Sequence, residues 1–91
     1  ERYIGYGHLD DDCEVKFYIT KPHDKKNASV GNGTMIALSA KSKEAVNKFH
    51  AKALENGAVN EGAPGERSDG NYYAYIRDLD GNKITARYVI N

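Results

Sequence analysis

The sequence predicts an α+β domain in which one amphipathic helix packs against a curled, mostly antiparallel sheet. Three observations support this fold class. A helical segment lies between residues 42 and 57, strand-like runs rich in β-branched and aromatic residues lie on both sides of it, and the last two runs flank a turn. From Thr34 onward the predicted order is strand, helix and then two or three antiparallel strands, which is a βαβββ unit.

The helix is the most clearly marked element of the sequence. Ser42 suits an N-cap, the segment KEAVNKFHAKALEN consists of good helix formers, and Gly57 suits the residue after the last turn. Apolar residues recur at helical spacing along one stripe: Val46, Phe49, Ala53 and Leu54. His50 falls away from this stripe, so we expect it to be a solvated residue.

Three strand-like runs precede the helix: the first two are rich in Tyr, Phe, Val and Ile, and the third is a short apolar run with β-branched residues. They lie at about Arg2–Gly7, Glu14–Thr20 and Thr34–Ala40. The acidic residues 10–12 predict a turn between the first two runs, because aspartates favour turn conformations. The polar stretch at residues 21–33, which contains proline and glycine, predicts a loop before the third run.

Two further strands and an irregular segment follow the helix. Residues 58–70 are rich in glycine, which predicts a loop or an irregular edge strand. Tyr72–Arg77 and Lys83–Ile90 predict a hairpin, because the sequence DLDGN between them supplies turn residues.

Alternation along the strands predicts two different faces of the sheet. One face of the last strand carries Ile84, Ala86, Tyr88 and Ile90, and the other carries Thr85, Arg87 and Val89. In the strand before the helix, Met35, Ala37 and Ser39 share a face. We expect the more apolar set on each strand to contact the helix and the other set to point away from it.

Composition narrows the class of protein. The chain has 91 residues, 40% of them apolar, which is enough for one packed domain and too apolar for a disordered chain. The formal net charge is zero, which argues against a nucleic-acid or membrane-surface binder. No apolar run approaches the roughly 20 residues of a membrane span, and no signal-peptide pattern opens the sequence. The single cysteine, Cys13, cannot form an internal disulfide, so we expect a cytoplasmic protein.

Several motifs resemble one known superfamily across nearly the whole chain. The segments IGYG, FYITKP, GNGT, GAPG and YYAYIRDLDGNKI resemble small bacterial glyoxalase-like members of the glyoxalase/bleomycin resistance/dioxygenase superfamily, which is also called the vicinal oxygen chelate superfamily. The resemblance implies two βαβββ modules that together enclose a cleft. We expect a single domain over residues 1–91, in which residues 34–91 form a complete second module and residues 1–33 are the remnant of an incomplete first module.

An incomplete module leaves an open sheet edge and an uncovered apolar face. A second copy of the chain would cover both, so we expect a homodimer, and exchange of elements between the two copies is one form that it can take.

The resemblance also predicts where a metal ion would bind. Metal-dependent members hold a divalent ion in the cleft with His and Glu or Gln side chains. The family histidine after GNGT corresponds to Met35, and the family glutamate after DGNKI corresponds to Thr85. A thioether is a soft ligand and a threonine hydroxyl is a weak neutral one, so neither suits a hard divalent cation. We therefore expect no metal cofactor and no catalytic residues at these degenerate positions.

The predicted ligand-binding cleft is lined by Met35, Ala37, Tyr75, Thr85 and Arg87. Arg87 can clamp a carboxylate or phosphate of a ligand. Alternatively, it pairs with a carboxylate from elsewhere in the chain or extends to the rim. The tyrosines of the hairpin offer stacking surface for a flat ligand, although alternation places half of them on the core side.

Three functions follow from the resemblance. The first is a non-catalytic protein that binds or sequesters an unknown small molecule, like the metal-free drug-binding members, and acts as a dimer. The second is a metal-dependent lyase or dioxygenase-type enzyme whose ligands lie in residues missing from this sequence. The third is a vestigial domain without a ligand. We prefer the first, because both family ligand positions that can be located are substituted.

Overall fold

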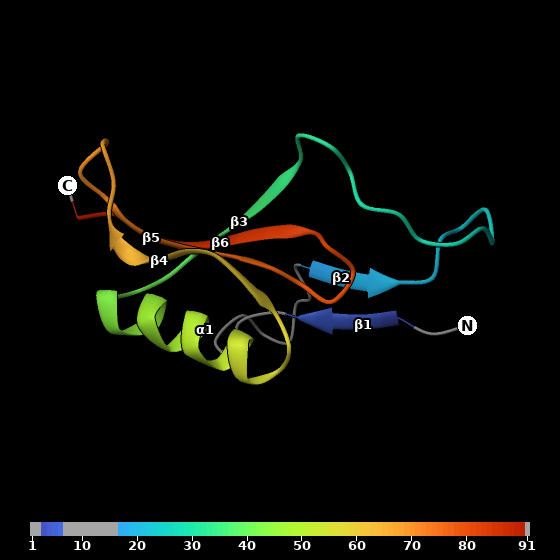
Figure 1. Cartoon of the computed structure of the whole chain (residues 1–91), viewed down its shortest axis with the longest axis horizontal. Helices are drawn as coiled ribbons and strands as arrows, with labels where there is room; N and C mark the ends of the chain where they lie inside the picture. Colours follow the sequence, from blue (N-terminus) through green and yellow to red (C-terminus); the bar gives the residue numbers. More distant parts are fainter. Residues whose placement is uncertain (1–2, 7–16, 91) are drawn as a thin grey trace.

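The computed structural model describes residues 3–6 and 17–90. Within these residues the elements, in chain order, are β1 (Tyr3–Tyr6), β2 (Phe17–Thr20), β3 (Met35–Ser39), α1 (Lys43–Glu55), β4 (Val59–Glu66), β5 (Tyr72–Arg77) and β6 (Lys83–Tyr88) (Figure 1). The predicted turn at residues 10–12 and Cys13 lie outside the described residues, as do parts of the first two predicted strands.

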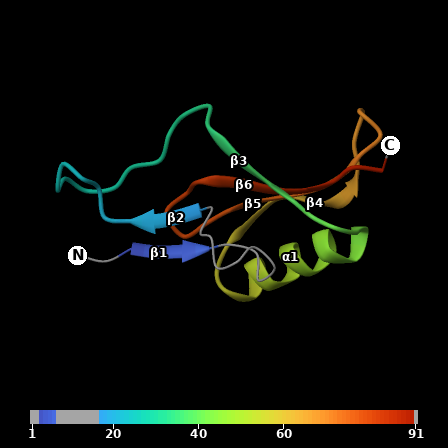
Figure 2. The same ribbon diagram turned by 180° about the vertical axis from the view of Figure 1, so that it is seen from behind.

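Four of the strands form one mixed sheet in the order β3-β6-β5-β4. β3 and β6 are parallel, whereas the other two neighbouring pairs are antiparallel. β1 and β2 form a separate antiparallel pair. Figures 1 and 2 show α1 on one face of the four-stranded sheet, which does not close on itself. The predicted α+β class and the βαβββ order are therefore confirmed. Among the described residues, no helix is long and apolar enough to cross a membrane.

The ends of α1 follow the predicted capping residues. The Ser42 side chain accepts a hydrogen bond from the backbone N–H of Ala45 at 3.0 Å, which satisfies one of the free donors of the first turn. At the other end, Gly57 follows the C-cap residue Asn56 with φ at +98°. This left-handed conformation favours glycine and ends the helix.

The core lies between α1 and the central strands. Val46 of the helix packs on Ala74 of β5 and Ala86 of β6, and all three are buried. Larger side chains surround this centre: Phe49, Tyr72 and Tyr88. The small alanines let the helix approach the sheet closely, and the aromatic rings fill the margins to interior density.

Two helix residues differ from the prediction. His50, expected in solvent, is only 9% exposed, and its Nε2 lies 2.8 Å from Oδ1 of Asn60 in β4. Leu54, expected in the apolar stripe, is 39% exposed. The reason is that residues 59–66 form the strand β4, which contacts α1. The side of the helix that carries His50 is therefore covered by β4. Sequence alternation gives no sign of this contact.

β4 is an irregular edge strand, as one of the two predicted alternatives stated. Its pairing with β5 shifts register between Asn60 and Gly62 and again between Gly62 and Gly65. Such bulges bend an edge strand and interrupt its ladder. Asn60 supports the first shift, because its side chain accepts the N–H of Gly62 at 3.0 Å.

The turn between β5 and β6 is organised by Asp78. Its Oδ1 accepts the backbone N–H of Asp80 at 3.0 Å and that of Asn82 at 2.8 Å. Gly81 adopts φ +89°, a conformation that favours glycine. The predicted hairpin is confirmed, with β6 ending at Tyr88.

Candidate functional site

The two faces of the sheet carry different side chains. α1 covers the face that carries Ala74 and Ala86. Residues paired across strands project to the same side, so the register defines the members of the opposite face. We call it the polar face, and its members on the three strands β3, β5 and β6 are Met35, Ala37, Ser39, Tyr73, Tyr75, Arg77, Lys83, Thr85 and Arg87.

All five predicted cleft residues lie on the polar face. Thr85 stands opposite Tyr75 on one side and Ala37 on the other. Thr85 is buried, Tyr75 and Arg87 are half-buried, and Ala37 is exposed. Met35 is 46% exposed and lies at the end of the face that is nearer to Lys83. The structure therefore places the five residues on one surface, with Thr85 beneath it.

Arg87 is held by a neighbouring phenol. Its Nε donates a hydrogen bond to the hydroxyl of Tyr73 at 2.9 Å, and that hydroxyl donates to Oδ2 of Asp69 at 2.5 Å. The bond from Tyr73 lowers the pKa of Asp69, and the backbone N–H of Asn71 lowers it further. Asp69 is thus ionised at neutral pH. Arg87 reaches a carboxylate from elsewhere in the chain, but only through Tyr73.

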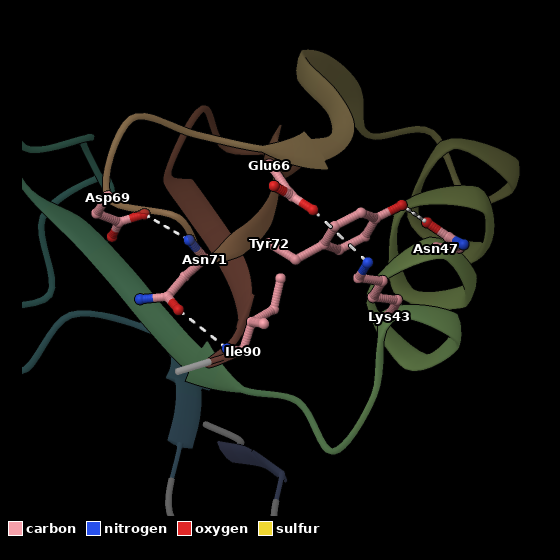
Figure 3. Close-up of polar contacts among 7 residues, drawn as sticks. All are labelled: Lys43, Asn47, Glu66, Asp69, Asn71, Tyr72 and Ile90. Atoms are coloured by element: carbon pink, nitrogen blue, oxygen red, sulfur yellow. Dashed lines mark hydrogen bonds and ion pairs between the residues drawn. The ribbon is translucent and has the colours of Figure 1, made fainter.

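The loop that carries Asp69 is tied to the rest of the fold (Figure 3). The backbone N–H of Asn71 donates to Oδ1 of Asp69 at 2.9 Å, and the side chain of Asn71 accepts the N–H of Ile90 at 2.9 Å. The next residue, Tyr72, donates its hydroxyl proton to Asn47 of α1 at 2.8 Å. The segment around Asp69 is therefore held by contacts with α1 and with the residues that follow β6.

An ion pair between Lys43 and Glu66 lies in the same region. Nζ of Lys43 lies 3.7 Å from Oε2 of Glu66, and Figure 3 shows it beside the ring of Tyr72. Both side chains are about half exposed, so the pair itself contributes little to stability. Its role is local: it joins the start of α1 to the end of β4.

Two tyrosines form the aromatic part of the polar face. The rings of Tyr73 and Tyr75 are nearly parallel, with centroids 5.7 Å apart and an interplanar angle of 5°. Cations lie near both rings: Arg87 is 5.8 Å from the centroid of Tyr73, whereas Lys83 and Arg67 are 5.3 Å and 5.4 Å from that of Tyr75. Contacts of this kind are attractive because the ring face is negative.

Gly62 makes room for this arrangement. A Cβ atom at residue 62 would lie 2.8 Å from Cδ2 of Tyr75 and 3.2 Å from a terminal nitrogen of Arg67. A side chain on β4 at this point would therefore displace the ring, the guanidinium or both. The absence of a side chain at Gly62 therefore leaves the space that Tyr75 and Arg67 occupy.

The terminal amino groups of Arg87 remain available. Within residues 3–6 and 17–90, its polar contacts are the Nε bond to Tyr73 and the contact with the same ring. Both contacts fix the orientation of the guanidinium without using Nη1 or Nη2. These two groups can donate a pair of parallel hydrogen bonds to one carboxylate.

The side chains of Met35 and Thr85, where the resemblance would place metal ligands, do not fit a hard divalent cation. The Thr85 hydroxyl is fully buried and donates to the carbonyl oxygen of Ala74 at 2.8 Å. Met35 offers a thioether, and its register partner is the cationic Lys83. A neutral hydroxyl and a soft sulfur do not replace the hydration of a dication. Among the described residues, no group of three or more His, Cys, Asp or Glu could hold a metal ion.

Sequence reasoning missed part of this surface. It did not identify Asp69 or Tyr73 as partners of Arg87, nor Arg67 beside Tyr75. It also missed a hollow of about 240 Å³ at one end of the polar face, which is lined by residues 31–34 and by Met35, Arg77 and Lys83. The alternation of β5 already placed Tyr73 and Arg77 on this face, but only the folded loops bring the remaining residues to it.

Comparisons with known proteins identify the relatives of this fold. No protein-family model and no curated protein matches the chain. A glyoxalase/bleomycin resistance protein from Albidiferax ferrireducens T118 is 44% identical, with a TM-score of 0.75, and the match covers 79% of this chain and 60% of that one. A hypothetical protein from S. aureus is 31% identical over 64% of this chain and 50% of its own, with a TM-score of 0.59.

A lactoylglutathione lyase from Agrobacterium tumefaciens is 25% identical, with a TM-score of 0.51, and the match covers 74% of this chain and 48% of the lyase. The chain therefore spans 60% or less of the length of each of these three structures. Its βαβββ fold and its 44% identity to a solved member show that the chain belongs to the glyoxalase/bleomycin resistance/dioxygenase family.

Proposed function

We propose that the polar face binds a small planar anion without a metal ion, and that the protein holds this molecule without converting it. The observation that carries the proposal is the orientation of Arg87. Its Nε is bonded to Tyr73 at 2.9 Å, while its terminal amino groups have no partner among the described residues. An arginine fixed in this way loses little conformational freedom when it binds a carboxylate.

The charge of the face supports an anionic ligand. Four cations lie on it or beside its rings: Arg67, Arg77, Lys83 and Arg87. Of the nearby acids, Glu61 pairs with Arg77 at 3.5 Å and Asp69 accepts the Tyr73 proton. Within the described residues the face therefore carries a positive excess, although the whole chain has a net charge of zero. Positive charge concentrated on one surface favours negatively charged ligands.

The aromatic pair supports a planar ligand. The parallel rings of Tyr73 and Tyr75 lie next to Arg87, so one ligand can contact a ring and the guanidinium together. Aromatic rings stack with an offset and add about 0.5–1.5 kcal/mol beyond the area that they bury. An aromatic carboxylate matches both features.

The ionisable groups favour binding over catalysis. A general acid at neutral pH needs a carboxyl whose pKa is raised. Asp69 is shifted in the opposite direction, because Tyr73 and Asn71 lower its pKa. The buried His50 belongs to the helix side of the sheet, where it contacts Asn60. The polar face is thus equipped to hold an anion rather than to transfer a proton.

The open edge of β3 supports a homodimer as the binding unit. Among the described strands, β3 pairs only with β6, so its other edge has free backbone groups. A second copy of the chain would cover that edge.

Benzoate is a suitable probe for the binding test. We expect benzoate, in buffer with a chelator, to raise the melting temperature of the chain in a saturable way, whereas the uncharged benzamide does not. Arg87→Gln should weaken benzoate binding at least about tenfold, because a charge-assisted hydrogen bond contributes roughly 1.5–3 kcal/mol. Lys52→Gln, which removes a positive charge from the exposed side of α1, is the matched control.

Sedimentation of the same samples reports the oligomeric state, and a dimer is expected. The proposal fails if neither benzoate nor other aromatic monocarboxylates stabilise the chain, or if Arg87→Gln binds them as tightly as the wild type. A requirement for added Zn²⁺ or Ni²⁺ would instead support the metal-dependent alternative.

A further inference from the structure

The hollow at the other end of the polar face is a separate polar site. It has a volume of about 240 Å³ and lies between residues 31–34, which lead into β3, and the hairpin residues Arg77 and Lys83. A water molecule occupies about 30 Å³ in the liquid. The space therefore accommodates a small polyatomic ion with several waters, and it is smaller than a typical drug-sized pocket, which starts at about 300 Å³.

Two positively charged residues line this hollow. Arg77 and Lys83 are direct register partners across β5 and β6. Like charges directly opposite one another destabilise a strand pair. Glu61 offsets one of them, since its Oε1 lies 3.5 Å from Nε of Arg77. The Lys83 ammonium lies over the ring of Tyr75 and has no carboxylate partner among the described residues. One positive charge thus stays uncompensated beside the hollow.

The loop that lines the hollow carries neutral backbone donors. The backbone N–H groups of Gly31, Asn32 and Gly33 hold no hydrogen bond within the described part of the chain. Gly33 adopts φ +97°, which a residue with a side chain rarely accepts. Successive backbone N–H groups in a bend that includes a left-handed residue are a common way to bind an oxyanion.

The guanidinium of Arg77 is fixed in position. Its Nη1 donates to the carbonyl oxygen of Gly81 at 2.9 Å, and its Nε faces Glu61. The remaining terminal group, Nη2, holds no hydrogen bond among the described residues. An oriented arginine and a glycine-containing loop therefore both line the hollow.

We infer that this hollow binds a tetrahedral oxyanion of the phosphate class through Lys83, Arg77 and the backbone of residues 31–33. This site lies at the other end of the polar face from Arg87, and its proposed ligand contacts do not include Arg87. Lys83 and Arg87 are four positions apart along β6, which corresponds to about 13 Å in an extended strand. Lysine as a point charge, an oriented arginine and backbone donors are all groups that bind phosphate.

The test is a titration of the ¹⁵N-labelled chain with inorganic phosphate, followed by amide chemical shifts. We expect saturable shifts at Gly31, Asn32 and Gly33. Lys83→Gln should weaken phosphate binding at least about tenfold, the effect of losing one hydrogen bond to a charged group. Arg87→Gln, which disrupts the other site, should leave phosphate binding unchanged, so the two proposals can fail separately.

Three controls keep the result decisive. Sodium chloride at matched ionic strength must not reproduce the shifts, because screening alone would then explain them. Lys52→Gln removes the same charge elsewhere and should bind phosphate normally. If Lys83→Gln loses the native spectrum, Lys83→Met retains an apolar stem over Tyr75 and replaces it. Absence of saturation at the three amides, or normal affinity without Lys83, overturns the proposal.

Discussion

The two faces of the β5–β6 hairpin differ in their side chains, although both are formed by alternate residues of the same two strands. Toward α1 the strands present Ala74 and Ala86, which pack against Val46 with almost no exposure. Away from it they present Tyr73 and Arg87, which are joined by a hydrogen bond and remain half-buried. One face stabilises the fold by exclusion of water, and the other keeps charged groups oriented at the surface. A change of one residue in register would exchange them.

Removal of side-chain volume should distinguish the faces most strongly. Ile84 is buried on the helix side, and Met35 is 46% exposed on the polar face. We expect Ile84→Ala to lower the free energy of unfolding by about 2–5 kcal/mol, because it leaves a cavity. Met35→Ala should change it by only about 0.5 kcal/mol, as surface substitutions do. Urea unfolding of both variants measures the difference, and equal losses would contradict the assignment of the faces.

Thr85 is the exception on the polar face, because it is fully buried. Thr85→Val keeps the shape of the side chain but removes the hydroxyl that donates to the Ala74 carbonyl oxygen. We expect a loss of about 1–2 kcal/mol in the free energy of unfolding.

Ser39→Ala is the matched control for Thr85, since Ser39 is exposed on the same face. It should stay within about 0.5 kcal/mol of the wild type. If Thr85→Val were equally harmless, the hydroxyl would have no structural role, and the position would be free to serve a ligand.

The smallest expected effect is on acid stability. The folded-state pKa of Asp69 is lowered by Tyr73, so its contribution to stability is present above the ordinary aspartate value of about 3.9 and is lost as the pH falls through the lowered value. Tyr73→Phe should raise the pKa of Asp69 toward 3.9. The variant should therefore lose less stability than the wild type as the pH falls.

Carboxyl NMR titration measures the pKa of Asp69 directly. Tyr75→Phe is the control, because no hydrogen bond of the Tyr75 hydroxyl occurs within the described residues. An unchanged pKa of Asp69 in Tyr73→Phe would show that the phenol does not bridge the acid and the arginine.

Local signals account for what the sequence could predict. Ser42 and Gly57 marked the helix ends, and the DLDGN turn marked the hairpin, because each acts through its own neighbours. Alternation then placed Arg87 on the face away from α1. The sequence alone also showed that Met35 and Thr85 carry side chains that are poor ligands for a hard divalent cation.

Contacts between distant segments account for what was missed. The burial of His50 depends on β4, whose strand pattern is hidden by glycines and bulges. The Asp69–Tyr73 bond depends on the path of a loop, and the hollow beside Lys83 joins segments about fifty residues apart. Composition and spacing do not show which distant segments come into contact. The members of the polar face on the strands were therefore predictable, whereas the loop residues that contact them were not.

The phenol between Asp69 and Arg87 has a consequence for how such a protein changes over time. The direction of the guanidinium is set through Tyr73 by a loop residue 18 positions earlier in the chain. Loops tolerate insertions and exchanges far better than central strands do. New specificities can therefore arise by altering residues 67–71, which turn the arginine toward a different ligand, while the strands that maintain the fold stay the same.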